Sequence, residues 1–132
     1  MRRTILVVED SQPCASTIEI TLQSIRGIEV VQAPSGLHAL EYLSKSESAA
    51  VGALITDLNM PVMDGFELIR RVRSNLRYAR LPIIVLSGDS DPGTPERIRQ
   101  LGADAYFVKP YSPSEVRNRI EELVNGYHSE AR

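Results

Sequence analysis

The feature that most constrains this chain is a fivefold alternation of short apolar runs with longer segments of helical periodicity. Four of the five runs are almost continuously apolar, which indicates strands covered on both faces, as in a parallel sheet. The remaining run, at residues 28–33, is partly polar and is expected at the edge of the sheet. The five runs are Ile5–Val8, Ile28–Ala33, Ala53–Thr56, Ile83–Ser87 and Ala105–Val108.

The segments between the runs carry apolar residues at spacings of three and four, which predicts amphipathic helices. The third segment is one example, because Phe66, Ile69, Val72 and Leu76 fall on one helical face. Turn residues mark the predicted helix ends. The expected N-caps are Thr94 and Ser112, and the glycines expected to follow the fourth and fifth helices are Gly102 and Gly126.

Five such units in 132 residues predict a single α/β domain with right-handed crossovers. The natural arrangement is a flavodoxin-like, doubly wound, five-stranded parallel sheet of order 2-1-3-4-5 with five helices. We expect this domain over residues 1–126, followed by a polar tail or the start of a linker at 127–132.

The composition restricts where the protein is expected in the cell and which partners it is expected to bind. The net charge of −2 argues against direct nucleic acid binding, and no apolar run is long enough to span a membrane. The single cysteine cannot form an internal disulfide. A cytoplasmic protein without a membrane partner is therefore expected.

Polar side chains follow four of the predicted strands at the point where each strand ends. They are Glu9 and Asp10, Asp57 with Asn59 close behind, Ser87, and Lys109. In a doubly wound sheet, ligands bind beyond the carboxyl ends of the strands, near the point where the strand order reverses. These groups are therefore expected to meet at one rim.

Three carboxylates in a small, partly desolvated volume repel one another when all are ionised. Lys109 supplies one compensating charge, and a divalent cation supplies more. Hard carboxylate oxygens suit Mg²⁺, which takes one or two carboxylates together with water and phosphate oxygens. That set of groups matches the needs of phosphoryl transfer, in which catalysis is positioning and charge neutralisation.

Each residue also has a purely structural interpretation. Glu9 or Asp10 alone is as well explained as a helix cap, Asp57 as a turn residue and Lys109 as a solvated charge. The functional interpretation depends on all of these groups arriving at the same rim.

Four segments of the chain resemble the response-regulator receiver family, and the resemblance covers about residues 3–125. The segments are ILVVED at 5–10, LITDLNMPVMDGFE at 54–67, VLSG at 85–88 and GADAYFVKP at 102–110. Their order and spacing also fit this family.

The resemblance implies a role for each matching residue. Asp57 corresponds to the phosphoacceptor, and Lys109 to the lysine that contacts a phosphoryl oxygen. Mg²⁺ is expected on Asp10 and Asp57 directly, on Glu9 through water, and on the backbone carbonyl of Asn59. The remaining correspondences are Ser87 and Tyr106 as the switch pair, Lys109–Pro110 as a cis peptide bond, and Asp64-Gly65 in the loop before the third helix.

The function implied is a phosphorylation switch of two-component signalling, rather than an enzyme acting on other molecules. Asp57 takes a phosphoryl group from a sensor histidine kinase or phosphotransfer protein and later loses it by self-catalysed hydrolysis. Phosphorylation then alters the face formed by the fourth helix, fifth strand and fifth helix. The candidate contacts on this face are Arg97, Arg99, Tyr106, Arg117 and Arg119, although a solvated surface explains the arginines equally well. That face is expected to bind a downstream effector protein or domain, with a homodimer as the alternative. Asn59 and Asp89 flank the site and are expected to influence the phosphoryl lifetime.

Two other classes of function compete with this interpretation. A phosphatase of the haloacid dehalogenase type also uses an aspartate after a strand, but it needs a second aspartate two residues later, where this chain has Asn59. A receiver that is never phosphorylated and serves only as a binding scaffold is the second alternative.

Overall fold

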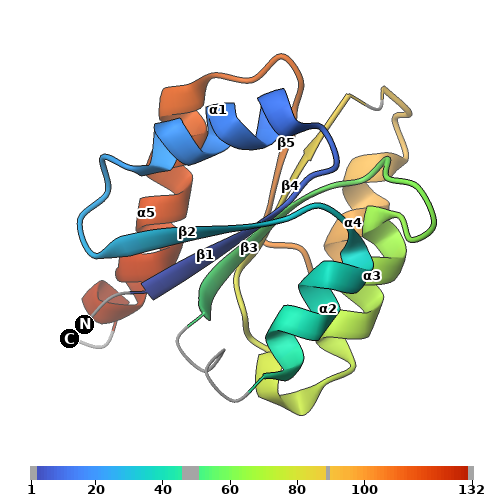
Figure 1. The fold of residues 1–132 in the computed structure, drawn as a ribbon, viewed down its shortest axis with the longest axis horizontal. Coiled ribbons are helices and arrows are strands. Elements are labelled where there is room, and N and C mark those ends of the chain that lie inside the picture. Colours follow the sequence, from blue (N-terminus) through green and yellow to red (C-terminus); the bar gives the residue numbers. More distant parts are fainter. Residues whose placement is uncertain (1–2, 46–50, 89, 131–132) are drawn as a thin grey trace.

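Five parallel strands form one sheet at the centre of the computed structural model, which describes residues 3–45, 51–88 and 90–130. The strands are β1 (Arg3–Val8), β2 (Ile28–Ala33), β3 (Val51–Asp57), β4 (Ile83–Ser87) and β5 (Ala105–Val108). Their order is β2-β1-β3-β4-β5, which confirms the predicted topology and places β2 at an edge (Figure 1).

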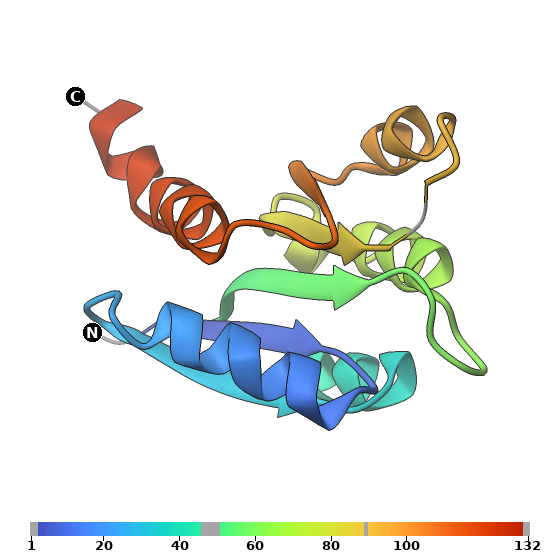
Figure 2. The same cartoon turned by 90° about the horizontal axis from the view of Figure 1, so that it is seen from above.

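Helices cover both faces of the sheet. Figures 1 and 2 show α1 (Gln12–Leu22) and α5 (Pro113–Glu130) on one face, and α2 (Gly36–Ser44), α3 (Gly65–Arg73) and α4 (Thr94–Leu101) on the other. None of the helices in the described ranges is long and apolar enough to cross a bilayer.

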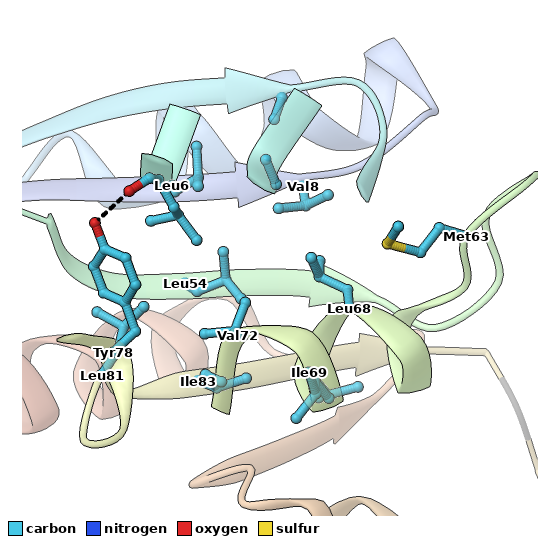
Figure 3. Packing of buried hydrophobic residues seen from close by; sticks show 14 of the residues in the cluster. Leu6, Val8, Leu54, Met63, Leu68, Ile69, Val72, Tyr78, Leu81 and Ile83 are labelled. Carbon is cyan, nitrogen blue, oxygen red and sulfur yellow. Dashed lines mark hydrogen bonds between the residues drawn. The ribbon is translucent and has the colours of Figure 1, made fainter. Parts of the chain in front are cut away.

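The two faces of the sheet bury two separate apolar clusters. The larger cluster lies under α2, α3 and α4 and includes Leu54 and Leu68 (Figure 3). The smaller cluster lies under α1 and α5 and includes Ile55 and Ile120. Adjacent residues of β3 thus enter different clusters, as the alternation of side chains along a strand requires. This double coverage is why the strand sequences are almost continuously apolar.

The prediction that Leu76 continues the apolar face of the third helix is wrong. The helix α3 ends at Arg73, and Leu76 begins a short 3-10 helix, η2 (Leu76–Tyr78), in which its side chain is 92% exposed. Tyr78 takes the buried position instead, and its hydroxyl donates a 2.7 Å hydrogen bond to the carbonyl of Leu43 (Figure 3). The Asn75 side chain caps η2 and so favours a new turn over a longer helix.

The helix ends agree with the sequence in part. Ser112 caps α5 through its hydroxyl, and Gly102 follows α4 with a φ of 106°, both as predicted.

Two predicted helix ends are wrong. Thr94 is not an N-cap, because it is the first residue of α4 and no side chain caps that helix. Gly126 is wrong as a helix end, because α5 continues to Glu130. Residues 127–130 include no proline that would break the helix, and one glycine in a helix costs only about 1 kcal/mol. The division into a domain at 1–126 and a tail at 127–132 stays a prediction.

Candidate functional site

The carboxyl ends of β1, β3 and β5 bring two carboxylates and one ammonium group together. Glu9 directly follows β1, Asp57 is the last residue of β3, and Lys109 directly follows β5. Glu9 is 5% exposed and Asp57 is 9% exposed, so both carboxylates are largely removed from water. The sequence predicted that these residues share a rim, and the structure brings these three into contact.

Lys109 lies between the two carboxylates. Its Nζ is 3.0 Å from Asp57 Oδ2 and 3.5 Å from Glu9 Oε1. Burial works to lower the pKa of Lys109, but the hydrogen bond and charge of Asp57, together with the charge of Glu9, outweigh burial and raise this pKa. Lys109 is therefore a permanent cation at the centre of the site.

The backbone holds the Asp57 side chain in place. Its Oδ1 accepts hydrogen bonds from the amide groups of Leu58, at 2.6 Å, and Asn59, at 3.3 Å. The chain then turns back, and the amide of Gly65 donates to the carbonyl of Leu58 at 2.9 Å. A Cβ atom on Gly65 would lie 2.4 Å from the carbonyl oxygen of Asp57, so only glycine fits this close approach.

Glu9 is held by Ser11 as well as by Lys109. Its Oε2 accepts a hydrogen bond from the Ser11 amide at 3.1 Å. Burial raises the pKa of Glu9, and the neighbouring carboxylates of Asp57 and Asp10 act in the same direction. The Ser11 amide and the Lys109 charge oppose this rise without cancelling it. The site thus holds more negative charge than Lys109 alone neutralises.

Sequence reasoning missed the contribution of Ser11. This residue caps α1 with its side chain and stabilises Glu9 with its amide. A serine directly before Gln12-Pro13 is an N-cap signal that points to it.

The other predicted residues differ in their positions and exposures. Ser87 ends β4 and is fully buried, and its carbonyl accepts a 2.7 Å hydrogen bond from the Lys109 amide. Tyr106 lies in β5, is half-buried and packs against the larger apolar cluster. Asp10 and Asn59 are exposed. Asp89 lies outside the described residues.

The donor set suits a hard divalent cation. Within the described ranges, no three acidic, histidine or cysteine side chains form a ready-made cage for a metal ion. Mg²⁺ does not need such a cage, because it usually keeps several waters and takes only one or two carboxylates. The excess of buried carboxylate charge beside Asp57 therefore fits Mg²⁺. The Lys109–Pro110 peptide bond next to the site is cis.

The predicted contact arginines of α4 and α5 are engaged within the molecule. Arg97 lies over the ring of Phe66 in α3, at 3.8 Å from the ring centre. Arg117 donates to the hydroxyl of Ser24 at 2.6 Å, beyond the end of α1. These two side chains contact elements outside the face formed by α4, β5 and α5. The arginines at 99 and 119 form exposed salt bridges with glutamates on their own helices.

Comparisons with known sequences identify a family and several similar proteins. The family described as "Response regulator receiver domain" matches residues 5–121. The chain is 33% identical to the "Chemotaxis protein CheY homolog" of Campylobacter jejuni over 120 residues, which are 91% of each chain. It is 37% identical to the "Transcriptional regulatory protein GltR" of Pseudomonas aeruginosa, matching 92% of this chain and 49% of that one.

The fold is also similar to that of solved structures. The structure of the Vibrio cholerae chemotaxis protein CheY4 superposes with a TM-score of 0.82 at 31% identity, covering 93% of this chain and 99% of that one.

Proposed function

The chain belongs to the response regulator receiver domain family, and from that premise we propose that Asp57 is the residue that accepts the phosphoryl group. Receiver domains of this family are signalling switches rather than classical enzymes, and they act with histidine kinases and effectors. The observation that carries the proposal is the contact of Asp57 with Lys109 at 3.0 Å, beside the second buried carboxylate of Glu9.

The geometry gives Asp57 the properties of a positioned nucleophile. One of its oxygens is fixed by two backbone amides, and the other faces the Lys109 ammonium. The carboxylate is thus oriented before a phosphodonor arrives, which lowers the entropic cost of reaching the transition state. The same ammonium is in position to neutralise charge on an incoming phosphoryl oxygen.

Receiver domains of this family generally use Mg²⁺ for phosphorylation. In this chain, Asp10 and Asp57 would hold the ion directly, Glu9 through water, and Asn59 through its backbone carbonyl. The ion supplies neutralisation of negative charge around the transferred group.

The proposed reaction has two steps. An Asp57 carboxylate oxygen attacks the phosphorus of a phosphohistidine on a partner kinase, the phosphorus–nitrogen bond breaks, and the histidine nitrogen leaves with the electron pair. Water later attacks the phosphorus of the aspartyl phosphate, which releases inorganic phosphate and restores the carboxylate. Both steps need charge neutralisation at the same place, which Lys109 provides.

The proposed switch connects this site to α4 and β5. Ser87 is buried at the end of β4, and Tyr106 packs against the larger cluster, which also contains Ile98 of α4. A Ser87 hydroxyl drawn toward the phosphoryl group would leave space for Tyr106 to change rotamer. The face formed by α4, β5 and α5 would then change its shape toward an effector, which is a two-state element biased by a local charge change.

The test is phosphorylation by a small phosphodonor, such as acetyl phosphate, with Mg²⁺ and with the metal removed by a chelator. We expect labelling of the wild-type protein only when Mg²⁺ is present, and no labelling of Asp57→Asn. The matched control is Asp91→Asn, which changes an exposed aspartate and should be labelled normally. Equal labelling of Asp57→Asn and the wild-type protein would remove the basis of the proposal.

A further inference from the structure

One cationic side chain connects α4 to α3, which lie side by side on the same face of the sheet (Figures 1 and 2). The guanidinium carbon of Arg97, in α4, is 3.8 Å from the centre of the Phe66 ring, in α3. This is well inside the distance of about 6 Å within which an aromatic ring attracts a cation. In the described ranges Arg97 forms no salt bridge, so its charge is directed at the ring rather than at a carboxylate. The neighbouring arginines, at 70, 71 and 99, instead pair with glutamates on their own helices.

Helix α4 is held less firmly than α3. Two of its eight residues are buried, and no side chain caps its first turn. By contrast, α3 buries four of its nine residues and is capped by Asp64. The two helices also enclose a groove of about 320 Å³, and Phe66 and Arg97 are both among the residues that line it. Few contacts therefore determine where α4 lies against α3, and the stack of Arg97 on Phe66 is one of them.

Phe66 belongs to the segment that carries the phosphoacceptor. It directly follows Gly65, whose amide donates to the carbonyl of Leu58 at 2.9 Å. The amide of Leu58 in turn donates to Asp57 Oδ1 at 2.6 Å. The backbone at Gly65 approaches the Asp57 carbonyl too closely for any side chain to fit, so the two segments cannot shift apart easily. The position of the Phe66 ring is thus fixed relative to Asp57.

Arg97 belongs to the segment that the proposed switch moves. Strand β4 ends at Ser87, and the chain leads from there into α4. Within α4, Ile98 is part of the larger apolar cluster, against which Tyr106 also packs. When Ser87 and Tyr106 move on phosphorylation, α4 moves with them, while Phe66 stays with the Asp57 segment. The distance between the guanidinium and the ring therefore differs between the two conformations of the switch.

The stack occurs together with the contacts of a free Asp57 carboxylate. In the same structure, Asp57 Oδ2 lies 3.0 Å from Lys109 Nζ, and a phosphoryl group on that oxygen would displace this direct contact. We propose that the stack of Arg97 on Phe66 stabilises the unphosphorylated conformation and thereby opposes phosphorylation of Asp57. This inference rests on the proposed function, because it requires that phosphorylation shifts α4. Arg97 is then a positioning residue that acts on Asp57 through Phe66.

The size of the effect follows from the strength of the stack. An interaction that exists in one of two conformations shifts the equilibrium between them by its own free energy. A cation–π pair at an exposed site changes an equilibrium constant by about two- to fivefold. The apparent affinity for a ligand rises with the population of the conformation that binds it. Loss of the stack should therefore strengthen binding of a phosphoryl mimic by about the same factor.

The experiment titrates the protein with beryllofluoride, a mimic of the phosphoryl group, in the presence of Mg²⁺, and measures the dissociation constant by calorimetry. Arg97→Gln should bind about two- to fivefold more tightly than the wild-type protein. Phe66→Leu removes the ring, keeps an apolar side chain and should bind more tightly by a similar factor. The double variant Arg97→Gln/Phe66→Leu should bind no more tightly than either single variant, because both changes remove the same interaction.

Two further variants serve as controls. Arg97→Lys keeps a cation for the ring and should bind with an affinity between those of Arg97→Gln and the wild-type protein. Arg99→Gln removes the same charge from the same helix, but Arg99 pairs with Glu96 instead of a ring of α3. This variant should bind like the wild-type protein.

Urea denaturation without beryllofluoride separates this role from a purely structural one. Arg97→Gln should be slightly less stable than the wild-type protein and yet bind beryllofluoride more tightly. A residue that only supports the fold would lower the stability and leave the affinity unchanged. A cooperative unfolding transition also shows that each variant is folded, and Phe66→Met replaces Phe66→Leu where the latter fails this check.

Three results would overturn the inference. They are an affinity of Arg97→Gln that equals or falls below that of the wild-type protein, an equal gain of affinity in Arg99→Gln, and additive gains in the double variant. In each of these cases the wild-type protein still binds beryllofluoride, and the proposed function stands. A wild-type protein that does not bind beryllofluoride with Mg²⁺ would remove the proposed function and this inference together.

Discussion

Replacing Lys109 by methionine tests whether the ammonium group holds the site together. The substitution keeps the length of the side chain and removes the charge that contacts Asp57 at 3.0 Å and Glu9 at 3.5 Å. Removing one partner of a fully buried ion pair costs about 3–5 kcal/mol. The Lys109 side chain is 28% exposed, so water screens part of this effect and we expect a loss of about 1–3 kcal/mol at neutral pH.

The loss of stability in Lys109→Met should depend on pH in a defined direction. The pKa of Glu9 is already raised from 4.5 by burial, and removal of the neighbouring cation raises it further. A carboxyl group with a raised pKa in the folded state stabilises the fold below its ordinary pKa, and this stabilisation is lost as the pH rises through the raised value. The variant should therefore approach wild-type stability near pH 4.5 and fall behind it toward neutral pH.

The assay for Lys109→Met is urea denaturation over this pH range, without metal and with Mg²⁺. The matched control is Lys45→Met, which removes the other lysine of the chain from an exposed position and should change stability by no more than about 0.5 kcal/mol. Added Mg²⁺ should restore part of the loss, because a ligand that binds only the folded state stabilises it. A Lys109→Met protein as stable as the wild type at neutral pH, or equally destabilised at every pH, would refute the reasoning.

Three further predictions follow from single contacts. Gly65→Ala should lose about 1–3 kcal/mol or more of stability in urea denaturation, because its Cβ would lie 2.4 Å from the Asp57 carbonyl oxygen, whereas Gly88→Ala, with nothing within 4 Å, should not. The wild-type protein should lose stability as the pH rises above 4.5, because the pKa of Glu9 is raised, and Glu9→Gln should not show this loss. Parallel profiles of unfolding free energy against pH for the two proteins would count against a raised Glu9 pKa. Tyr78→Phe should lower stability by about 1 kcal/mol through its buried hydroxyl, and an unchanged denaturation midpoint would show that this hydrogen bond contributes nothing net.

The fold was predictable because its signals are repeated along the chain. Continuous apolar runs indicated covered strands, and the partly polar run at 28–33 indicated the edge, where β2 lies. The errors fall where one local contact outweighs a periodic pattern. Leu76 fits the spacing of α3, yet the Asn75 cap and the buried Tyr78 form a separate turn, and only the three-dimensional structure shows that Tyr78 reaches the end of α2.

The candidate site was predictable as a set of residues but not as a set of contacts. Strand ends and the family resemblance pointed to Glu9, Asp57 and Lys109, because parallel strands present their carboxyl ends at one rim. The sequence did not show that Lys109 contacts both carboxylates, or that Ser11 supports Glu9. Contacts between side chains a hundred positions apart, such as Glu9 and Lys109, depend on the closing of the whole sheet.

The most direct test of the central claim is to locate the phosphoryl group on the chain. The protein is incubated with acetyl phosphate and Mg²⁺, the acyl phosphate is reduced with borohydride, and the modified residue is identified by mass spectrometry of its peptides. Modification is expected at Asp57 alone, with none in protein incubated without the phosphodonor. Modification at Asp10 or any other residue, with Asp57 unchanged, would contradict the central claim.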